Sequence, residues 1–242
     1  KNKVVVITGA ASGMGRSYAL MFARLGSKIA ICDYDEKGLK ETEKLVRQAA
    51  DVQLYSEKLD VSDKAGVYAF AQAVKAALGD AHVIINNAGL MSIAPMSERR
   101  TDEWDRMIDV NIRGVLHGIA AVLPLMQAQR SGQLVNIASI GAYSVVPTGA
   151  VYCATKYAVR AISEGLRQEV GGDIRVTLVS PGVVESELAE SISDESSREA
   201  MKAFRKVAIT PDAIARAIAY AVEQPADVDV SELIVRPTAS PY

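Results

Sequence analysis

A tyrosine and a lysine four residues apart carry the first recognisable chemistry in this sequence. Tyr152 and Lys156 lie in a helix-like stretch, so their side chains share one helix face. A free tyrosine titrates near pH ~10, and a neighbouring ammonium favours its phenolate form. Ser139, thirteen residues before Tyr152, offers a hydroxyl to a substrate oxygen. This group fits acid/base chemistry at an oxygen, although a tyrosine alone on such a helix is more often a packing residue.

A glycine-rich segment follows the first apolar run of the chain. Thr8 to Gly15 reads TGAASGMG, directly after the run 4–7 and at the start of a helical pattern. Small residues allow a tight turn and close approach of a ligand, and the N-terminus of the next helix offers N–H groups to a pyrophosphate. An ordinary glycine turn is the alternative interpretation. The candidate dinucleotide contacts in this segment are Gly9, Ser12, Gly13, Met14 and Gly15.

Asp33 indicates which dinucleotide is bound. It lies just beyond the second apolar run, where a carboxylate accepts hydrogen bonds from the adenosine ribose. It would repel the extra phosphate of NADP, and neither Ser12 nor Tyr34 is basic. These residues favour NAD over NADP. Two alternatives stay open: Asp33 caps a turn, or a basic residue nearby in the sequence, Arg16 or Lys28, accommodates the phosphate.

Several motifs, in order along the chain, resemble those of the short-chain dehydrogenase/reductase family. The glycine segment matches Thr-Gly-x-x-x-Gly-x-Gly, and the resemblance covers essentially the whole chain. Further matches are Asp60-Val61, the segment Asn86-Asn87-Ala88-Gly89, Asn111, Ser139, the Tyr152-x-x-x-Lys156 pair and Pro181-Gly182. One departure is Ser186, which stands where the family often has threonine.

The resemblance implies roles for these positions. It implies a catalytic tetrad of Asn111, Ser139, Tyr152 and Lys156, in which Asn111 holds a water that links the lysine to solvent. Tyr152 and Lys156 would also contact the cofactor, the lysine at the nicotinamide ribose. The further cofactor contacts that it implies are Asp60, Val61, Asn87, Ala88, Gly89, Pro181, Gly182, Val184 and Ser186.

The elements that must position these residues alternate along the chain. Short apolar runs predict strands at 4–7, 28–32, 53–59, 83–86, 134–137, 174–179 and 233–235. Periodic segments predict helices at 17–25, 36–49, 62–78, 101–129 with a bend before Pro124, 150–170, 193–207 and 211–222. Such alternation indicates an α/β fold: a Rossmann-type, doubly wound, seven-stranded parallel sheet with helices on both faces. We expect one domain spanning 1–242.

The substrate side is less defined. Residues 187–206 are polar and follow the nicotinamide turn, so we expect a substrate lid there, with a solvated surface helix as the alternative. The expected pocket liners neighbour the motifs and are mostly apolar: Met91, Ile140, Gly141, Tyr143 and Val183. No arginine is placed to hold a carboxylate, unless Arg198 or Arg205 does so from the lid. This favours a small ketone, hydroxyketone or secondary alcohol.

Composition excludes other classes of protein. The net charge is −2 and the pI is near 5.8, which argues against a nucleic-acid partner. No membrane span is expected, since no run reaches roughly 18 apolar residues. Two cysteines, Cys32 and Cys153, and no expected leader suit a reducing, cytoplasmic setting. Cys153 has no base beside it, and His82 and His117 are isolated, so no cysteine nucleophile and no metal site is expected.

Together these features predict an oxidoreductase that moves a hydride between NAD(H) and a carbonyl or alcohol carbon, with Tyr152 as acid/base. One alternative is an NADPH-dependent reductase of 3-oxoacyl substrates, which Asp33 argues against. Another is a non-catalytic nucleotide sensor, which the intact tetrad argues against. Helices 102–129 and 150–170 are apolar over more than one face, and related enzymes pair them across subunits. We expect a homo-oligomer, with a tetramer favoured.

Overall fold

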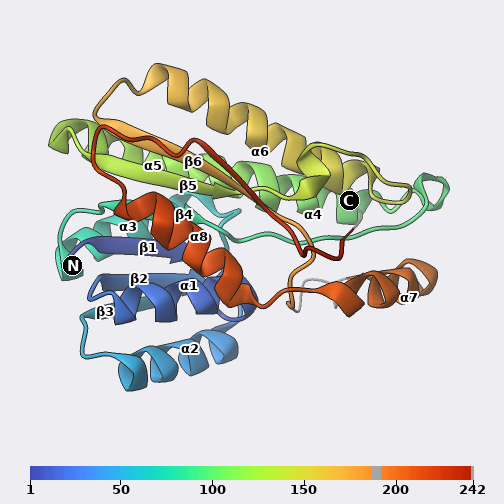
Figure 1. Cartoon of the computed structure of the whole chain (residues 1–242), viewed down its shortest axis with the longest axis horizontal. Helices are drawn as coiled ribbons and strands as arrows, with labels where there is room; N and C mark the ends of the chain where they lie inside the picture. The colour runs from blue at the N-terminus through green and yellow to red at the C-terminus, as the bar shows by residue number, and fades with distance from the viewer. Residues whose placement is uncertain (187–191, 241–242) are drawn as a thin grey trace.

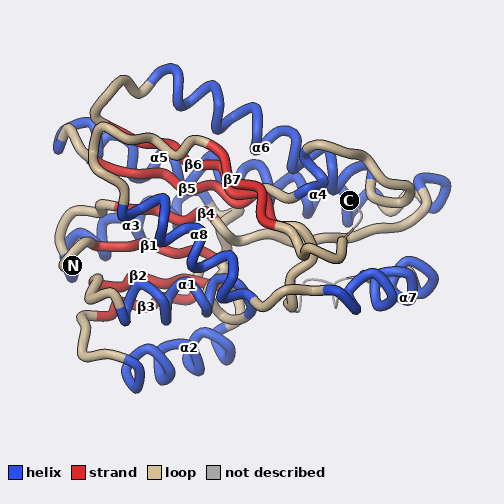
Figure 2. Tube along the Cα trace, in the orientation of Figure 1, coloured by secondary structure: helices blue, strands red, loops and turns tan. Residues whose placement is uncertain are grey.

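The centre of the molecule is a seven-stranded parallel sheet, coloured red in Figure 2. The computed structural model describes residues 1–186 and 192–240, with all of their side chains except those of 200–204. The strand order is β3-β2-β1-β4-β5-β6-β7. The strands are β1 (Val4–Thr8), β2 (Lys28–Asp33), β3 (Leu54–Lys58), β4 (Val83–Asn86), β5 (Gly132–Ile137), β6 (Ile174–Pro181) and β7 (Glu232–Val235). The doubly wound sheet predicted from the sequence is confirmed.

Helices cover both faces of this sheet (Figure 1). One face packs against α1 (Gly13–Arg24), α2 (Glu36–Ala49) and α8 (Pro211–Glu223). The other packs against α3 (Lys64–Leu78), α5 (Gly114–Gln129) and α6 (Ala150–Glu169). Every residue of β1, β4 and β6 is buried, as expected for strands that have helices on both sides.

The order of the strands fixes where a ligand would bind. The chain winds outward from β1 through β2 to β3, and then returns to add β4 on the opposite side of β1. The helices that follow β1 and β4 therefore cover opposite faces of the sheet, and the carboxyl ends of these two strands mark the place where a doubly wound sheet is expected to form a ligand-binding crevice. Two of the three glycine-containing motifs begin in the loops that follow these two strands, after Thr8 and after Asn86.

The predicted helix at 101–129 is interrupted. It divides into α4 (Thr101–Ile108), a π-helical turn η2 (Asp109–Arg113) and α5, whereas Pro124 lies inside a continuing α5. The irregular turn therefore precedes the predicted bend and contains Asn111. Two helix starts also differ: α1 begins at Gly13, and α3 is preceded by Asp63, because Ser62 hydrogen-bonds Asp60 instead.

The segment Thr101–Gln129 has the length and composition of a membrane-crossing helix. Its most apolar window has a mean hydropathy of 1.3, and 44% of that window is buried inside the molecule. Helix α5 packs there against α3, β4 and β5. A place in the core of the α/β fold therefore accounts for part of its apolar character.

The predicted lid region is described only in part. Residues 187–191 lie outside the described residues, so that part of the expectation for 187–206 is untested. Ile192 to Asp194 lead into α7 (Glu195–Phe204) and the 3₁₀ turn η5 (Arg205–Val207). Helix α7 lies beyond the carboxyl ends of the strands, at the end of the molecule opposite the N-terminus (Figure 1).

Candidate active site

The glycine loop after β1 is held by the loop after β4. Gly9 has a φ of +68°, and a Cβ there would lie 2.7 Å from the Cα of Ala88. The side-chain Nδ2 of Asn87 donates to the carbonyl oxygens of Thr8 (3.0 Å) and Gly9 (2.9 Å). The hydroxyl of Thr8 in turn accepts from the backbone N–H groups of Asn87 and Ala88, both at 3.1 Å. Glycine is thus required at position 9 for both its conformation and its close packing.

The N-terminus of α1 lies at the carboxyl end of β1, and no side chain caps it. Ser12 is the N-cap residue, but its side chain makes no capping hydrogen bond. Gly13 has a φ of +49°. A Cβ added at Gly13 would lie 3.4 Å from the Cβ of Ser186, so these two residues are neighbours. The structure therefore brings Ser12, Gly13 and Ser186 together around an uncapped helix start, which suits an anionic group.

Asp33 lies at the end of β2, beside the glycine loop. Its Oδ2 accepts from the N–H of Ala11 and its Oδ1 from the N–H of Asp35, both at 2.9 Å. Burial raises the pKa of Asp33, and these backbone hydrogen bonds act in the opposite direction. The turn-capping interpretation is therefore correct as a description of its contacts. It is compatible with ribose binding, because each carboxylate oxygen accepts more than one hydrogen bond.

The two nearby basic residues are used elsewhere. Arg16 donates to the hydroxyl of Thr42 (2.9 Å) and to the backbone oxygens of Ala11 and Gly38. Lys28 lies at the opposite end of β2 from Asp33 and donates to the carbonyl of Leu78 at 2.9 Å. The guanidinium of Arg16 therefore supports the backbone beneath the glycine loop.

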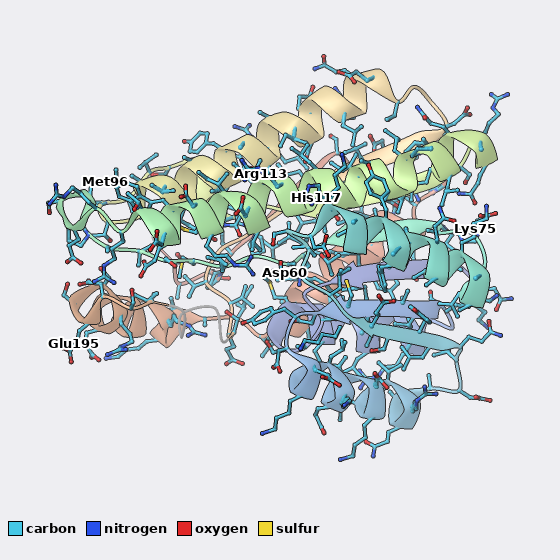
Figure 3. The ribbon with its side chains drawn as sticks, turned by 180° about the vertical axis from the view of Figure 1, so that it is seen from behind. Asp60, Lys75, Met96, Arg113, His117 and Glu195 are labelled. Atoms are coloured by element: carbon cyan, nitrogen blue, oxygen red, sulfur yellow. The ribbon has the colours of Figure 1, made fainter. Side chains whose placement is uncertain are left out.

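Asp60 and Val61 follow β3 in a short polar network. The Oδ2 of Asp60 pairs with Arg106 at 2.7 Å, and its Oδ1 accepts from the hydroxyl of Ser62 at 2.7 Å. Burial raises the pKa of Asp60, but the bonds from Arg106 and Ser62 outweigh it and lower the pKa overall. The carbonyl of Val61 bonds the Nδ1 of His117 at 2.9 Å. Figure 3 shows Asp60 and His117 in the same part of the molecule.

Ser139, Tyr152 and Lys156 meet where β5 ends and α6 begins. A Cβ on Gly141 would lie 3.5 Å from both the Oγ of Ser139 and the Cε1 of Tyr152, so these two side chains are neighbours across Gly141. The Nζ of Lys156 lies 5.8 Å from the centre of the Tyr152 ring and donates to the carbonyl of Ile137 at 3.1 Å. The predicted sharing of one helix face is confirmed for this pair.

The protein groups alone do not lower the pKa of Tyr152. Burial raises it to about 12, although a hydrogen bond with Ser139 acts in the opposite direction. Burial also lowers the pKa of Lys156 to about 8. The expected lowering of the tyrosine pKa by the ammonium of Lys156 concerns the complex with an oxidised, cationic nicotinamide, and it stays a prediction for that complex.

Asn111 is fixed by the π-helical turn and by its neighbours. Its Oδ1 accepts from the N–H of Leu90, and its Nδ2 donates to the carbonyl of Leu90, both at 2.9 Å. The same Nδ2 donates to the hydroxyl of Thr155 at 3.0 Å, and this hydroxyl donates to the carbonyl of Tyr152 at 2.7 Å. Gly89 packs against both Asn111 and Lys156. Asn111 thus joins the loop after β4 to the helix that carries Tyr152.

The turn after β6 closes the crevice. The N–H of Gly182, next to Pro181, donates to Val235 of β7 at 2.8 Å, and Val184 forms an isolated bridge with Ile209. Arg205, one of the two arginines considered for the lid, donates to the carbonyl of Ser186. The guanidinium of Arg205 therefore ties η5 to this turn.

The apolar side chains around Tyr152 differ in part from those expected. Met91, Ile93 and Ile192 form a buried cluster that packs against Tyr152. Only Met91 was expected among pocket liners. Tyr143, a further expected pocket liner, bonds Ser180 (3.1 Å) and Glu232 through its hydroxyl, and the guanidinium of Arg160 lies over its ring; its place in the pocket stays a prediction.

Sequence reasoning missed the residues that support this site from a distance. Thr155 and Arg106 hold Asn111 and Asp60, and Ile192 covers Tyr152. Ile192 lies inside the predicted lid at 187–206, but no signal singled it out as the residue that packs against Tyr152. Within the described part of the chain, no group of three or more His, Cys, Asp or Glu side chains is placed to hold a metal ion.

Comparisons with known proteins agree with this architecture. A sequence model of the short chain dehydrogenase family matches residues 3–197. An oxidoreductase of Staphylococcus saprophyticus is 45% identical over 242 residues, which cover 99% of this chain and 97% of the relative.

Two solved structures are similar over almost the whole chain. A serine dehydrogenase in its closed form with NADP+ has a TM-score of 0.91 at 29% identity, covering 99% of this chain and 96% of that one. A short-chain dehydrogenase/reductase of Burkholderia phymatum with NAD has a TM-score of 0.89 at 29% identity, covering 97% and 89%. The chain therefore belongs to the short-chain dehydrogenase/reductase family of oxidoreductases.

Proposed function

We propose that this protein transfers a hydride between NAD(H) and a small ketone, hydroxyketone or secondary alcohol, with Tyr152 as the acid/base. The observation that carries the proposal is the position of three side chains relative to the glycine loop. Ser139, Tyr152 and Lys156 lie at the carboxyl end of β5 and the start of α6, in the same crevice as the glycine loop and Asp33.

The residues around the crevice fit a dinucleotide. The uncapped start of α1 would hold the pyrophosphate, and Asp33 would accept from the ribose hydroxyls. The Oδ1 of Asn87 is buried and has no hydrogen-bond partner among the described residues, which leaves an acceptor for a ligand donor. Asp33 favours NAD, because its carboxylate would repel a ribose phosphate.

The residues of the chain would divide the work of carbonyl reduction. When bound, NADH supplies the hydride. Tyr152 donates its hydroxyl proton to the carbonyl oxygen, and Ser139 donates a hydrogen bond to the same oxygen as negative charge develops. Lys156 favours the phenolate that Tyr152 leaves behind. The Nζ of Lys156 lies beside Gly89, next to Asn111, a position from which the lysine can exchange protons with solvent through a water.

The cluster around Tyr152 supports the substrate class. Met91, Ile93 and Ile192 are all apolar and buried, so a charged group placed against them would lose its hydration without gaining a partner. The guanidinium of Arg205 is held at Ser186, away from this cluster. A compact, uncharged substrate therefore fits best against this apolar cluster.

The test is nicotinamide absorbance with NAD and with NADP, over a panel of small ketones, diketones and secondary alcohols. Tyr152→Phe is expected to lower kcat by at least about 100-fold, the usual worth of a general acid, with little change in cofactor affinity. Tyr220→Phe is the matched control, since Tyr220 lies on α8 and is 56% exposed. Turnover of Tyr152→Phe close to that of the wild type would overturn the assignment.

A further inference from the structure

We infer that Arg100 is a positioning residue that latches Ile192 over Tyr152 and so sets which substrates reach the active site. The inference rests on the function proposed above. It concerns a polar group, called the latch below, that consists of Glu98, Arg100 and Glu103 around the start of α4 and of Ser193 and Asp194 before α7.

Arg100 is the centre of this group. Its guanidinium pairs with Glu98 at 2.6 Å, lies 3.4 Å from Glu103 and 4.0 Å from Asp194, and donates to the hydroxyl of Ser193. That hydroxyl donates to Glu103 at 2.6 Å. These contacts join the loop after β4 to the segment after β6. In that segment they involve Ser193 and Asp194, the two residues that follow Ile192.

Ile192 is the residue that this latch holds in place. It is 1% exposed and packs with Met91 and Ile93 against Tyr152. The next two residues, Ser193 and Asp194, are the ones bound by Arg100. Loss of the contacts of Arg100 would therefore free Ser193 and Asp194, directly beside the apolar cluster that packs against Tyr152.

The latch also holds the beginning of α7. The Oδ1 of Asp194 accepts from the N–H of Ser197 at 2.7 Å and from the hydroxyl of Ser196 at 2.9 Å, so Asp194 caps this helix. Figure 3 shows Met96, just before the latch, and Glu195, the first residue of α7, at the same end of the molecule. Arg100 thus couples the helix to the loop that bears Met91 and Ile93.

The chemistry of the latch predicts a dependence on salt. Arg100 is 26% exposed and Asp194 13%, so these ion pairs are partly open to solvent, and mobile ions weaken them. A wall held by apolar contacts alone would not respond to salt in this way. Salt therefore distinguishes a latch from ordinary packing.

The decisive experiment needs no substrate. Ile192→Cys places a thiol at a buried position, and the native Cys32 and Cys153 are 0% and 1% exposed, so labelling by an aryl disulfide reports opening at position 192. Adding Arg100→Gln is expected to speed labelling by about tenfold, which corresponds to about 1.4 kcal/mol. Adding Ser193→Ala is expected to speed it less. Equal rates with and without Arg100→Gln would overturn the inference.

The matched control is Arg130→Gln in the same Ile192→Cys chain. Arg130 pairs with Asp173 at 3.0 Å, and this exposed pair lies far from the latch, so the labelling rate should stay unchanged. A rate that rises as much with Arg130→Gln as with Arg100→Gln would indicate general loosening and would also overturn the inference.

Kinetics give the second readout, with the best substrate of the panel. Arg100→Gln should raise KM by up to about tenfold, the factor by which closure is weakened in the labelling experiment, while kcat and the affinity for NAD stay within twofold. Arg100→Lys should restore part of the loss. In wild type, 0.5 M NaCl should raise KM, and in Arg100→Gln it should not. Absence of turnover in wild type would contradict the proposed function, whereas fast labelling in Arg100→Gln would still support the latch.

Discussion

Lys156 illustrates the conflict between stability and function at a single residue. Its ammonium is buried beside Tyr152 and donates a hydrogen bond to the carbonyl of Ile137. Burial lowers its pKa to about 8, from 10.5 in an exposed chain. Folding therefore disfavours the charged form, which is the form that the proposed chemistry requires. We propose that the lysine is retained at a cost to the fold because the proposed reaction needs a cation there.

This conflict predicts that Lys156→Met abolishes turnover but stabilises the protein near pH 7 by about 1–3 kcal/mol. Below the folded pKa of about 8, the wild type carries the full penalty of a buried charge. Between about 8 and 10.5 the unfolded chain binds more protons, so wild-type stability rises with pH relative to the variant. Urea denaturation of both proteins from pH 6.5 to 10.5 (roughly the span of the two pKa values) measures this. A stability difference that does not shrink as the pH rises would contradict it.

Asp33 allows a second prediction at the residue scale. Asp33→Asn removes the charge, while its remaining oxygen still accepts from Ala11 or Asp35. The ratio of kcat/KM for NADP to that for NAD should rise by at least about tenfold, because like-charge repulsion of at least ~1.4 kcal/mol is lost. Steady-state kinetics with both cofactors measure the ratio. An unchanged ratio would show that other residues select the cofactor.

At the scale of elements, one buried arginine holds the end of a helix. Arg175, at the start of β6, is 9% exposed. Its guanidinium donates to the carbonyl oxygens of Ala221, Val222, Gln224 and Val228 at 3.1–3.3 Å. These carbonyls lie at the end of α8 and in the turn that follows it, where a helix leaves acceptors without partners. Arg175 therefore joins α8 to the sheet.

Arg175→Met should lower the free energy of unfolding by about 2–4 kcal/mol, because buried carbonyls lose their donors. It should leave kcat of the folded protein unchanged, since Arg175 lies at the opposite end of β6 from the crevice. Arg216→Ala is the control: its pair with Asp212 is exposed and should contribute less than ~1 kcal/mol. Urea denaturation measures both. A loss as small as that of the control would contradict the helix-capping role.

The sequence predicted elements better than it predicted contacts between them. The glycine loop and β1 lie next to each other in the chain, so local patterns were enough to find them. The latch joins Arg100 to Ser193, which are 93 positions apart, and Asn111 reaches Thr155, 44 positions away. The π-helical turn at Asn111 is stabilised by the backbone of Leu90, which no helical periodicity encodes. Folding decides such pairings, and single residue types do not reveal them.

At the scale of the whole molecule, α5 and α6 expose apolar stripes on the same face of the sheet. On α5 the exposed side chains recur every four residues at Leu116, Ala120 and Pro124, and Leu116 is 42% exposed. On α6 an equivalent stripe contains Tyr157, which is 38% exposed, and Ala161. Apolar stripes on adjacent long helices are typical of a surface that a second helix pair covers.

We therefore expect a homo-oligomer in which α5 and α6 pack against those of a second copy, with a tetramer favoured. Leu116→Lys would place a charge in this apolar stripe, and it should lower the mass measured by light scattering at micromolar concentration. Tyr68→Lys, at an exposed aromatic on α3, is the matched control and should leave the mass unchanged. A monomeric wild type, or an unchanged mass for Leu116→Lys, would contradict this assembly. A lower mass together with retained turnover would show in addition that each copy carries a complete active site.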